Sequence, residues 1–252
     1  MKPASRQGAL VVTGASRGIG AAVARMAGKE GYRVGVLYRE KFDEAQQVVS
    51  DIVAAGSEAL AVRCDVGNEA DIVHAFDMLA LRFGGICGLV NNAGITGGIS
   101  RVSDLTAAIL EEVCRINITG AFLCAREAVN RMSTRRGGKG GGIVNLSSLA
   151  ARTGTPNVWI HYAATKGAID TMTIGLAKEV AGDGIRVNAV RPGLIETDIH
   201  IGREPGQLAR LVQMVPLARI GEPDEVAASV VWLLSDAASY VTGALIDVGG
   251  GL

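Results

Sequence analysis

Short apolar stretches rich in β-branched residues alternate with longer amphipathic stretches along almost the whole chain. Seven of the short stretches are expected to be strands, at residues 9–14, 33–38, 58–66, 85–94, 141–148, 185–193 and 243–250. Because they are mostly apolar throughout, they are expected to be buried on both faces, as in a parallel sheet covered by helices. The stretches between them have the three-to-four-residue period of amphipathic helices.

This alternation predicts an α/β fold of the Rossmann type, with a doubly wound parallel sheet of about seven strands and helices on both faces. No linker divides the chain, so residues 1–252 are expected to form a single domain. Two stretches interrupt the rhythm. The glycine-rich stretch 134–142 indicates a solvated connection. The long, irregular stretch 193–221 is expected to be a lid over substrate.

The composition is that of a soluble globular protein, with 48% hydrophobic and 20% charged residues. Lys and Arg number 25, as do Asp and Glu, so no net charge attracts nucleic acid or an anionic membrane. The four cysteines lack metal-site spacing and are expected to be buried, reduced thiols. No apolar stretch has the length of a signal peptide core or a membrane span. We therefore expect a cytoplasmic protein without metal, nucleic-acid or membrane partners.

The first chemical signal is TGASRGIG, directly after the first predicted strand. Gly14, Gly18 and Gly20 allow a tight turn and a close approach of phosphate to the backbone at a helix N-terminus. Their spacing differs from the dinucleotide fingerprint G-x-G-x-x-G. Their position in the first strand-to-helix turn nevertheless favours a nucleotide site.

The end of the second predicted strand bears on the choice of nucleotide. An acidic residue about twenty residues beyond the glycines commonly binds the ribose of NAD. Here Tyr38 and Arg39 occupy that place, and Arg17 lies in the glycine turn. Two guanidinium groups suit a 2′-phosphate, so NADP is predicted over NAD. In the alternative, Arg39 is solvated and Glu40 binds the ribose.

Polar residues occur at two places where apolar or turn residues are usual. Asn117 lies on an apolar helical stripe with Val113 and Ala121, where a buried amide needs partners. A backbone carbonyl, a buried water or a catalytic network would each supply them. Ser147 and Ser148 lie at the carboxyl end of a predicted strand, where open α/β sheets bind ligands. Serines there are also common turn residues, so the signal is weak alone.

Tyr162 and Lys166 are one helical turn apart in HYAATKGAID, on a face shared with Asp170 and Thr173. A free tyrosine has a pKa near 10. An ammonium one turn away favours the phenolate and is expected to lower that pKa toward the working range. Such a tyrosine exchanges a proton with an alcohol or a developing alkoxide. His161 points away from this face and lacks an acidic partner, so a structural or substrate-lining role is expected for it.

These motifs, in this order over essentially the whole chain, resemble the short-chain dehydrogenase/reductase family. TGASRGIG resembles its cofactor turn, NNAG at 91–94 its strand-four motif, YAATK its Tyr-x-x-x-Lys, and RPG at 191–193 a further family segment. The chain is similar to bacterial members named as glucose dehydrogenases or 3-oxoacyl-carrier-protein reductases. The resemblance implies a single dinucleotide-binding oxidoreductase domain. It would transfer a hydride between NADP(H) and a carbonyl or secondary alcohol substrate.

The resemblance also implies a role for each site residue. Tyr162 would be the general acid/base, and Lys166 would lower its pKa and bind the nicotinamide ribose. Ser148 would bind the substrate carbonyl, and Asn117 would hold a water in a proton relay. The cofactor would be contacted by Gly14, Ser16, Arg17, Gly18, Ile19, Gly20, Tyr38, Arg39, Asp65, Val66, Asn91, Ala93, Gly94, Tyr162, Lys166, Pro192, Gly193, Ile195 and Thr197.

One departure and two alternative functions qualify this picture. The interval from Ser148 to Tyr162 is one residue longer than the commonest family spacing, which leaves Ser147 as an alternative hydroxyl.

A ketoreductase for carrier-bound 3-oxo substrates would dock an acidic carrier on basic residues. The candidates are Arg131, Arg135, Arg136 and Lys139, although such clusters are usually solvated. A non-catalytic dinucleotide-sensing scaffold would be expected to lack the tyrosine, lysine or serine, and all three are present.

The assembly is expected from the resemblance alone. It implies a homotetramer in which helices at 107–132 and 162–181 pack across twofold axes. The substrate stays open at this level. The lid offers Glu196, His200, Arg203 and Glu204, which suit polyols, keto esters or uncharged molecules alike.

Overall fold

The structure, a computed structural model, describes residues 8–197 and 206–252. Within this part of the chain, seven parallel strands form one sheet in the order β3-β2-β1-β4-β5-β6-β7. The strands are β1 (Ala9–Val12), β2 (Arg33–Tyr38), β3 (Ala59–Arg63), β4 (Ile86–Asn91), β5 (Gly141–Leu146), β6 (Ile185–Pro192) and β7 (Leu245–Val248). Each predicted strand stretch contains one of them, so the predicted parallel sheet is confirmed.

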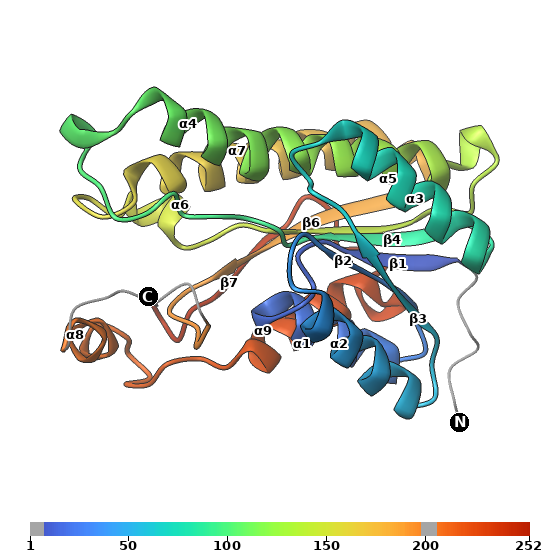
Figure 1. Ribbon diagram of the computed structural model, residues 1–252, viewed down its shortest axis with the longest axis horizontal. Coiled ribbons are helices and arrows are strands. Elements are labelled where there is room, and N and C mark those ends of the chain that lie inside the picture. The colour runs from blue at the N-terminus through green and yellow to red at the C-terminus, as the bar shows by residue number, and fades with distance from the viewer. Residues whose placement is uncertain (1–7, 198–205) are drawn as a thin grey trace.

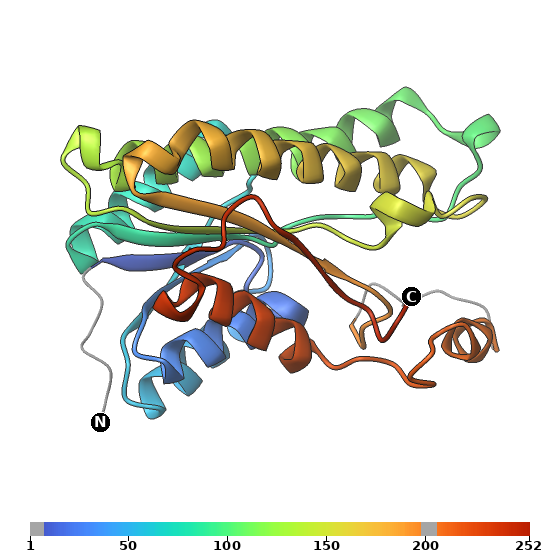
Figure 2. The same ribbon diagram turned by 180° about the vertical axis from the view of Figure 1, so that it is seen from behind.

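Helices cover both faces of the sheet (Figures 1 and 2). One face carries α1 (Gly18–Lys29), α2 (Phe42–Ala54) and α9 (Pro223–Leu234). The other carries α3 (Glu69–Phe83), α4 (Ala107–Cys114), α5 (Ala121–Met132) and α7 (Ile160–Val180). Two short helices, α6 (Ala150–Thr153) and α8 (Gln207–Gln213), complete the set, and α8 lies apart from both layers. The doubly wound Rossmann-type fold is therefore confirmed.

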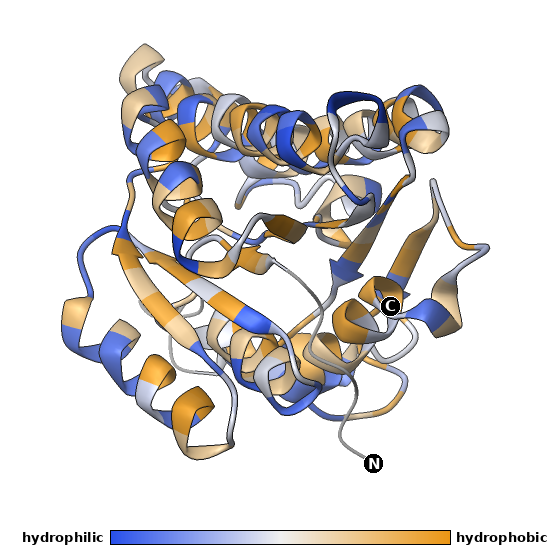
Figure 3. Cartoon of the chain, turned by 90° about the vertical axis from the view of Figure 1, so that its right-hand side faces the viewer, coloured by the Kyte–Doolittle hydropathy of each residue, from blue (hydrophilic) through white to orange (hydrophobic). Residues whose placement is uncertain are grey.

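Two apolar cores, one on each face of the sheet, hold the layers together. Successive residues of a strand point to opposite faces. Leu10 accordingly belongs to the core under α1 and α9, and Val11 to the core under α3, α5 and α7. Both side chains are fully buried, and burial of this kind contributes about 1.5–3 kcal/mol per large side chain. The strands are mostly hydrophobic for this reason (Figure 3).

The helical stretch at 107–132 is not continuous. A π-helical turn, η2 (Arg115–Gly120), separates α4 from α5 and carries Asn117. Such turns occur often at functional sites. The apolar stripe predicted to carry Asn117 runs from Leu110 through Val113 to Met132. Val113 and Met132 are buried, but Leu110 is 40% exposed. The stripe prediction is therefore wrong at its first position.

Two further features bear on the predictions. None of the helices in the described ranges is long and apolar enough to cross a membrane. Cys64 and Cys124 are buried as predicted, but Cys114 is exposed. The expectation of buried thiols is therefore wrong for Cys114.

Strand order determines where a ligand would bind. After β1 the chain proceeds outward through β2 and β3, and β4 then returns to the other side of β1. In open α/β sheets, ligands bind outside the carboxyl ends of the strands at such a reversal. The loops that follow β1 and β4 therefore flank the expected site.

Candidate active site

A cleft of about 900 Å³ lies at the carboxyl ends of the strands. This volume is typical of small-molecule and cofactor sites. The cleft is lined by seventeen of the predicted site residues, namely Gly14, Ser16, Arg17, Gly18, Ile19, Arg39, Asp65, Val66, Ala93, Gly94, Ser148, Tyr162, Lys166, Pro192, Gly193, Ile195 and Thr197. Residues far apart in the sequence thus converge on one site.

The glycine turn after β1 forms one wall of the cleft. Gly14 and Gly18 have φ values of 61° and 55°, in the left-handed region that favours glycine. The turn leads directly into α1, whose first N–H groups are not used within the helix and suit a phosphate. Gly20 does not line the cleft. A Cβ atom there would lie 2.5 Å from the Gly14 carbonyl oxygen, so this glycine allows the turn to close on itself.

Asn92 joins the glycine turn to the loop after β4. Its Nδ2 donates to the carbonyl oxygens of Thr13 and Gly14, at 2.8 and 3.0 Å. In return, the Thr13 hydroxyl accepts from the N–H groups of Asn92 and Ala93, at 2.9 Å each. Asn92 lines the cleft but was absent from the predicted site residues. Its place in the NNAG stretch was the signal available in the sequence.

Asn91 and Tyr38, both predicted to contact the cofactor, do not line the cleft. The Asn91 Nδ2 donates to the Asn145 Oδ1 at 3.0 Å and to the Ala121 carbonyl at 3.1 Å. Asn91 therefore ties β4 to β5 and α5 in a buried layer. Tyr38 is 8% exposed and its ring lies 6.0 Å from that of Phe42. Packing of the core accounts for both side chains.

Ser148 and Tyr162 meet at one end of the cleft. Tyr162 is buried and shares a hydrogen bond with Ser148. The Ser148 Oγ also accepts from the Ala150 N–H at 3.1 Å. The Ser147 hydroxyl instead donates to the Lys166 carbonyl at 3.1 Å. Of the two candidate hydroxyls, Ser148 is therefore the one that pairs with the tyrosine.

Burial governs the protonation of Tyr162 and Lys166. It raises the pKa of Tyr162 to about 12, against the opposing effect of the hydrogen bond to Ser148. It lowers the pKa of Lys166 to about 8, against the opposing charge of Asp170. The expected lowering of the tyrosine pKa is thus wrong for the protein without ligands. The reason is the burial of the phenol, which outweighs the groups that favour the phenolate. The Lys166 Nζ donates to the Leu146 carbonyl at 2.6 Å and lies 5.6 Å from the tyrosine ring centre.

Asp170 links the lysine to the end of β6. Its Oδ2 accepts from the Arg191 Nη2 at 2.8 Å and from Nε at 3.0 Å. Both side chains are less than one fifth exposed. Charge-assisted pairs of this geometry are among the stronger hydrogen bonds in proteins. The pair therefore anchors the lysine-bearing turn of α7 to β6.

Asn117 does not line the cleft but lies behind the catalytic end. Its Oδ1 accepts from the Ile95 N–H at 2.9 Å, and its Nδ2 donates to the Ile95 carbonyl at 2.8 Å and to the Thr165 hydroxyl at 3.0 Å. A Cβ atom on Gly94 would lie 3.3 Å from the Asn117 Oδ1 and 3.6 Å from the Lys166 Nζ. The amide is thus satisfied by protein groups and fixes the loop after β4 beside Lys166.

His161 is buried in α7 outside the cleft. A Cβ atom on Gly97 would lie 3.1 Å from its Nε2. Neither ring nitrogen has a hydrogen-bond partner among the described atoms. A substrate-lining role is therefore not supported, and His161 packs between α7 and the loop after β4.

The end of the cleft beside Tyr162, named here the substrate end, is built from uncharged residues apart from Lys166. Trp159 packs edge-on against Tyr162, with ring centroids 6.2 Å apart. The other described lining residues of this end are Ile95, Thr96, Leu149, Ala150, Thr153, Thr155, Pro156, Val158, Leu194, Leu211 and Met214. None of them carries a formal side-chain charge.

The predicted lid is only partly described. Residues 198–205, which include His200, Arg203 and Glu204, lie outside the described residues. Glu196 is described but does not line the cleft. In the remainder of the predicted lid, α8 and the residue after it contribute Leu211 and Met214 to the substrate end. Closure of the lid remains a prediction.

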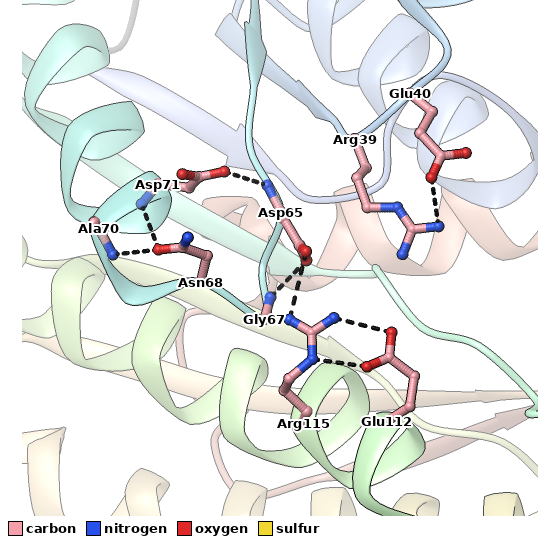
Figure 4. Close-up of polar contacts among 9 residues, drawn as sticks. All are labelled: Arg39, Glu40, Asp65, Gly67, Asn68, Ala70, Asp71, Glu112 and Arg115. Carbon is pink, nitrogen blue, oxygen red and sulfur yellow. Dashed lines mark hydrogen bonds and ion pairs between the residues drawn. The ribbon is translucent and has the colours of Figure 1, made fainter. Parts of the chain in front are cut away.

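The opposite end of the cleft, named here the cofactor end, is charged. Arg17, Arg39, Glu40 and Lys41 all line it. The Arg39 Nη2 lies 2.8 Å from the Glu40 Oε1 (Figure 4). The cofactor end therefore offers cationic side chains, which suit a 2′-phosphate, and also a carboxylate, which suits a ribose.

The basic residues proposed for carrier docking lie elsewhere. Arg131 pairs with Glu127 and Asp77, and Arg135 pairs with Asp183. They precede β5, at the amino ends of the strands, whereas the cleft opens at the carboxyl ends. A strand of six residues is about 20 Å long. This cluster is therefore poorly placed to deliver a substrate to Ser148.

Fold and cleft together define a Rossmann-type α/β oxidoreductase with a Ser–Tyr–Lys site. The chain belongs to the short-chain dehydrogenase/reductase family. A family model described as Enoyl-(Acyl carrier protein) reductase matches residues 14–252. Family membership implies a nicotinamide cofactor and a carbonyl or alcohol substrate, as the sequence predicted.

Similarity to individual proteins extends over nearly the whole chain. The chain is 49% identical to "Uncharacterized oxidoreductase YgfF" of Escherichia coli K12. The similarity covers 96% of this chain and 98% of that protein. It is 40% identical to a 3-oxoacyl-[acyl-carrier-protein] reductase of Synechocystis, and this similarity covers 96% of this chain and 95% of that protein. A solved mutant of a Serratia marcescens short-chain dehydrogenase/reductase is 30% identical, with a TM-score of 0.90 and 98% of each chain covered.

Proposed function

We propose that the protein is an NADP(H)-dependent oxidoreductase that interconverts an uncharged carbonyl compound and its secondary alcohol. The observation that carries this proposal is the pairing of Ser148 with Tyr162, beside Lys166, in the same cleft as the glycine turn. When bound, the nicotinamide supplies or accepts the hydride. The remaining chemistry is proton transfer and charge stabilisation by the protein.

The residues of the cleft fit a dinucleotide. Gly14 and Gly18 form a phosphate cradle at the N-terminus of α1. At the other end, Gly94 leaves open the space next to Asn117 and Lys166 that a Cβ atom would enter. This combination favours a cofactor that spans the cleft from the glycine turn to Tyr162.

Tyr162 acts as the general acid in carbonyl reduction. Its raised pKa keeps the phenol protonated at neutral pH, so it is ready to donate a proton to the developing alkoxide. Ser148 donates a hydrogen bond to the same oxygen and stabilises its growing charge. Lys166, charged below about pH 8, favours negative charge at that oxygen and binds the nicotinamide ribose. Asn117 keeps the loop at Gly94 in place through its hydrogen bonds to Ile95. Its role in holding a relay water remains a prediction.

The preference for NADP rests on charge at the cofactor end. The three cations Arg17, Arg39 and Lys41 outnumber the two carboxylates there, Glu40 and Asp65. The Arg39–Glu40 pair is exposed, 44% and 68% respectively, and such pairs contribute only about 0–1 kcal/mol. A phosphate dianion therefore displaces the carboxylate at little cost. In the alternative, Glu40 binds the ribose of NAD.

The substrate proposal rests on the apolar substrate end. Trp159 and Met214 offer a surface for a hydrophobic group, and Lys166 is the one charged side chain among the described residues that line this end. The carrier-protein ketoreductase is the second candidate, since a relative carries that name. The position of Arg131 and Arg135 at the opposite edge of the sheet weighs against docking on that cluster. A non-catalytic sensor is disfavoured because the serine, tyrosine and lysine are assembled.

A screen of NADPH oxidation tests the proposal. The panel contains neutral ketones, keto esters and sugars, each ketone paired with a carboxylate analogue of similar size. We expect turnover of neutral ketones or keto esters, faster with NADPH than with NADH. Preference for the carboxylate analogues, or for NADH, would contradict the proposed substrate class or cofactor.

We also propose a cytoplasmic homotetramer formed through α4, α5 and α7. Phe122 on α5 and Ile174 on α7 are 50% and 39% exposed, as expected for faces covered by another subunit. Light scattering after size-exclusion chromatography should give four times the chain mass. A monomer would contradict this assembly.

A further inference from the structure

The π-helical turn η2 packs directly on the loop that follows β3. A Cβ atom on Gly67 would lie 1.7 Å from the Arg115 Nη1 and 2.3 Å from its Cζ. At the other end of the turn, a Cβ atom on Gly120 would lie 2.5 Å from the Val66 carbonyl oxygen. Both ends of η2 therefore contact residues 65–67, and Gly67 makes room for a guanidinium group.

Glu112 determines the orientation of that guanidinium group. Its two oxygens accept from the Arg115 Nε and Nη2 at 2.7 and 2.9 Å (Figure 4). A carboxylate that binds Arg through two parallel hydrogen bonds leaves the guanidinium group little freedom to rotate. The remaining terminal nitrogen, Nη1, lies 3.4 Å from the Asp65 Oδ2. Arg115 is thus held between a carboxylate of its own helix and one of the β3 loop.

Asp65 is otherwise fixed through only one of its carboxylate oxygens. Its Oδ1 accepts from the Gly67 N–H at 2.9 Å, and its own N–H donates to the Asp71 Oδ2 at 3.0 Å (Figure 4). These contacts shape the loop backbone. The Oδ2 has the Arg115 Nη1 as its neighbour at 3.4 Å, and Asp65 itself lines the cleft. Arg115 therefore determines the orientation of this oxygen.

We propose that Arg115 is a positioning residue for the adenine end of the cofactor and acts through Asp65. The inference rests on the proposed dinucleotide-binding function. A carboxylate oxygen held toward the cleft accepts a hydrogen bond from the adenine amino group. Arg115 itself does not line the cleft. Its contribution is to prevent rotation of the carboxylate and to keep the Gly67 turn closed.

The position of Arg115 also connects the two ends of the cleft. It begins the same short turn that carries Asn117, two residues further on. Arg115 contacts the loop after β3, and Asn117 contacts the loop after β4 at Ile95. The turn therefore connects the adenine end and the catalytic end, through Arg115 to the loop after β3 and through two hydrogen bonds of Asn117 to Ile95 in the loop after β4.

Two variants remove the contact in different ways. Arg115→Gln deletes the charge. Gly67→Ala keeps every charge but places a methyl group where the guanidinium lies, and its other close neighbour is the flexible tip of Ile116. Gly67 does not have a positive φ, so alanine is compatible with the backbone. The matched control is Arg126→Gln on α5, whose partners Glu69 and Glu127 do not line the cleft.

Isothermal titration calorimetry measures binding of NADPH, of ADP, which has the adenine end only, and of reduced nicotinamide mononucleotide, which lacks it. Both variants should weaken NADPH and ADP by about fivefold, the effect of losing a half-exposed ion pair. The mononucleotide should bind as it does to the wild type. The double variant should lose little beyond either single variant, because both displace the same group. Arg126→Gln should bind all three ligands normally.

Three outcomes would overturn the inference or its basis. Unchanged NADPH and ADP affinity in folded Arg115→Gln and Gly67→Ala proteins, verified by circular dichroism, would overturn it. An equal loss for the mononucleotide would also overturn it, because the effect would then be a general distortion of the cleft. Failure of the wild type to bind either NADPH or NADH would instead remove the proposed function, and this is visible before any variant is made.

Discussion

The glycine turn at the cofactor end and residues 154–158 at the substrate end both contain backbone in the left-handed region, but with different residue types. At the cofactor end, Gly14 and Gly18 adopt it at φ values of 61° and 55°. At the substrate end, Gly154 adopts it at 70°, but so do two residues that are not glycine, Thr155 and Asn157, at 40° and 64°. Glycine enters this region without steric cost. A threonine there costs about 1–3 kcal/mol and persists only when its surroundings impose it.

The difference shows what determines the backbone shape at each end of the cleft. The shape of the glycine turn follows from its own residues and from the clamp by Asn92. The shape of residues 154–158 follows from contacts that the local sequence does not encode, such as the hydrogen bond from the Ser100 N–H to the Val158 carbonyl at 3.0 Å. We therefore expect the cofactor end to tolerate few changes, and the substrate end to change specificity with modest substitutions.

The largest expected effect separates chemistry from binding at the two ends. Tyr162→Phe should lower kcat by about 10²–10⁴-fold, the range for loss of a general acid. Affinity for NADPH, measured by calorimetry, should stay near that of the wild type because the cofactor end is untouched. His161→Asn, adjacent on α7 but outside the cleft, is the control and should retain turnover. Substantial turnover by Tyr162→Phe would refute the catalytic assignment.

The next effect tests the charge of the cofactor end. Replacing Arg39 and Arg17 by alanine should weaken NADPH binding by about 10–100-fold, as expected for hydrogen bonds to a charged phosphate. NADH should be affected less than about threefold. Arg25→Ala, on α1 but paired with Asp51, controls for loss of a cation near the turn. An equal loss for both nucleotides would leave the 2′-phosphate proposal without support.

The pH dependence of carbonyl reduction tests the catalytic pair between the two ends. Lys166, with a pKa lowered to about 8, loses its charge as the pH rises through 8, whereas Tyr162 stays protonated to about pH 12. The rate should be constant below pH 8 and fall about tenfold per pH unit above it. Lys166→Arg should abolish the fall, since arginine keeps its charge. A rate that rises between pH 8 and 10 would mean that the phenolate is the active form.

The smallest effect concerns the substrate end. Met214 is 67% exposed and lines the cleft beside Leu211. Met214→Ala should raise the KM for a hydrophobic ketone by about two- to fivefold, the effect of losing part of an apolar contact. The kcat and the NADPH affinity should not change. Leu81→Ala, exposed on α3, is the control. An unchanged KM would indicate that this part of the predicted lid does not contact substrate.

Features that depend on local residue type could be predicted from the sequence. The strands follow from continuous apolar runs, the turn from its glycines, and the Tyr162–Lys166 pair from the four-residue helical period. Each of these patterns is complete within about ten residues of chain. The structure places them where the sequence indicated.

Features that depend on distant partners could not be predicted. Asn91 and Asn92 are adjacent and chemically identical, but only the tertiary structure shows that Asn92 lines the cleft while Asn91 ties the strands together. The raised pKa of Tyr162 depends on burial, which only the tertiary structure reveals. Helical spacing alone pointed to the opposite shift.

The π-helical turn η2 makes the chain tolerant of a change in length at this point. A π-helical turn holds one residue more than the α-helical turn it replaces, because its hydrogen bonds join residues five apart instead of four. Deletion of one residue between 115 and 120 would therefore restore a regular α-helix and leave Cys124 and Met132, which are fully buried, on the same face of α5. The spacing of Arg115 and Asn117 would change instead. A one-residue deletion here should accordingly preserve the fold but disturb the contacts of these two side chains to the loops after β3 and β4.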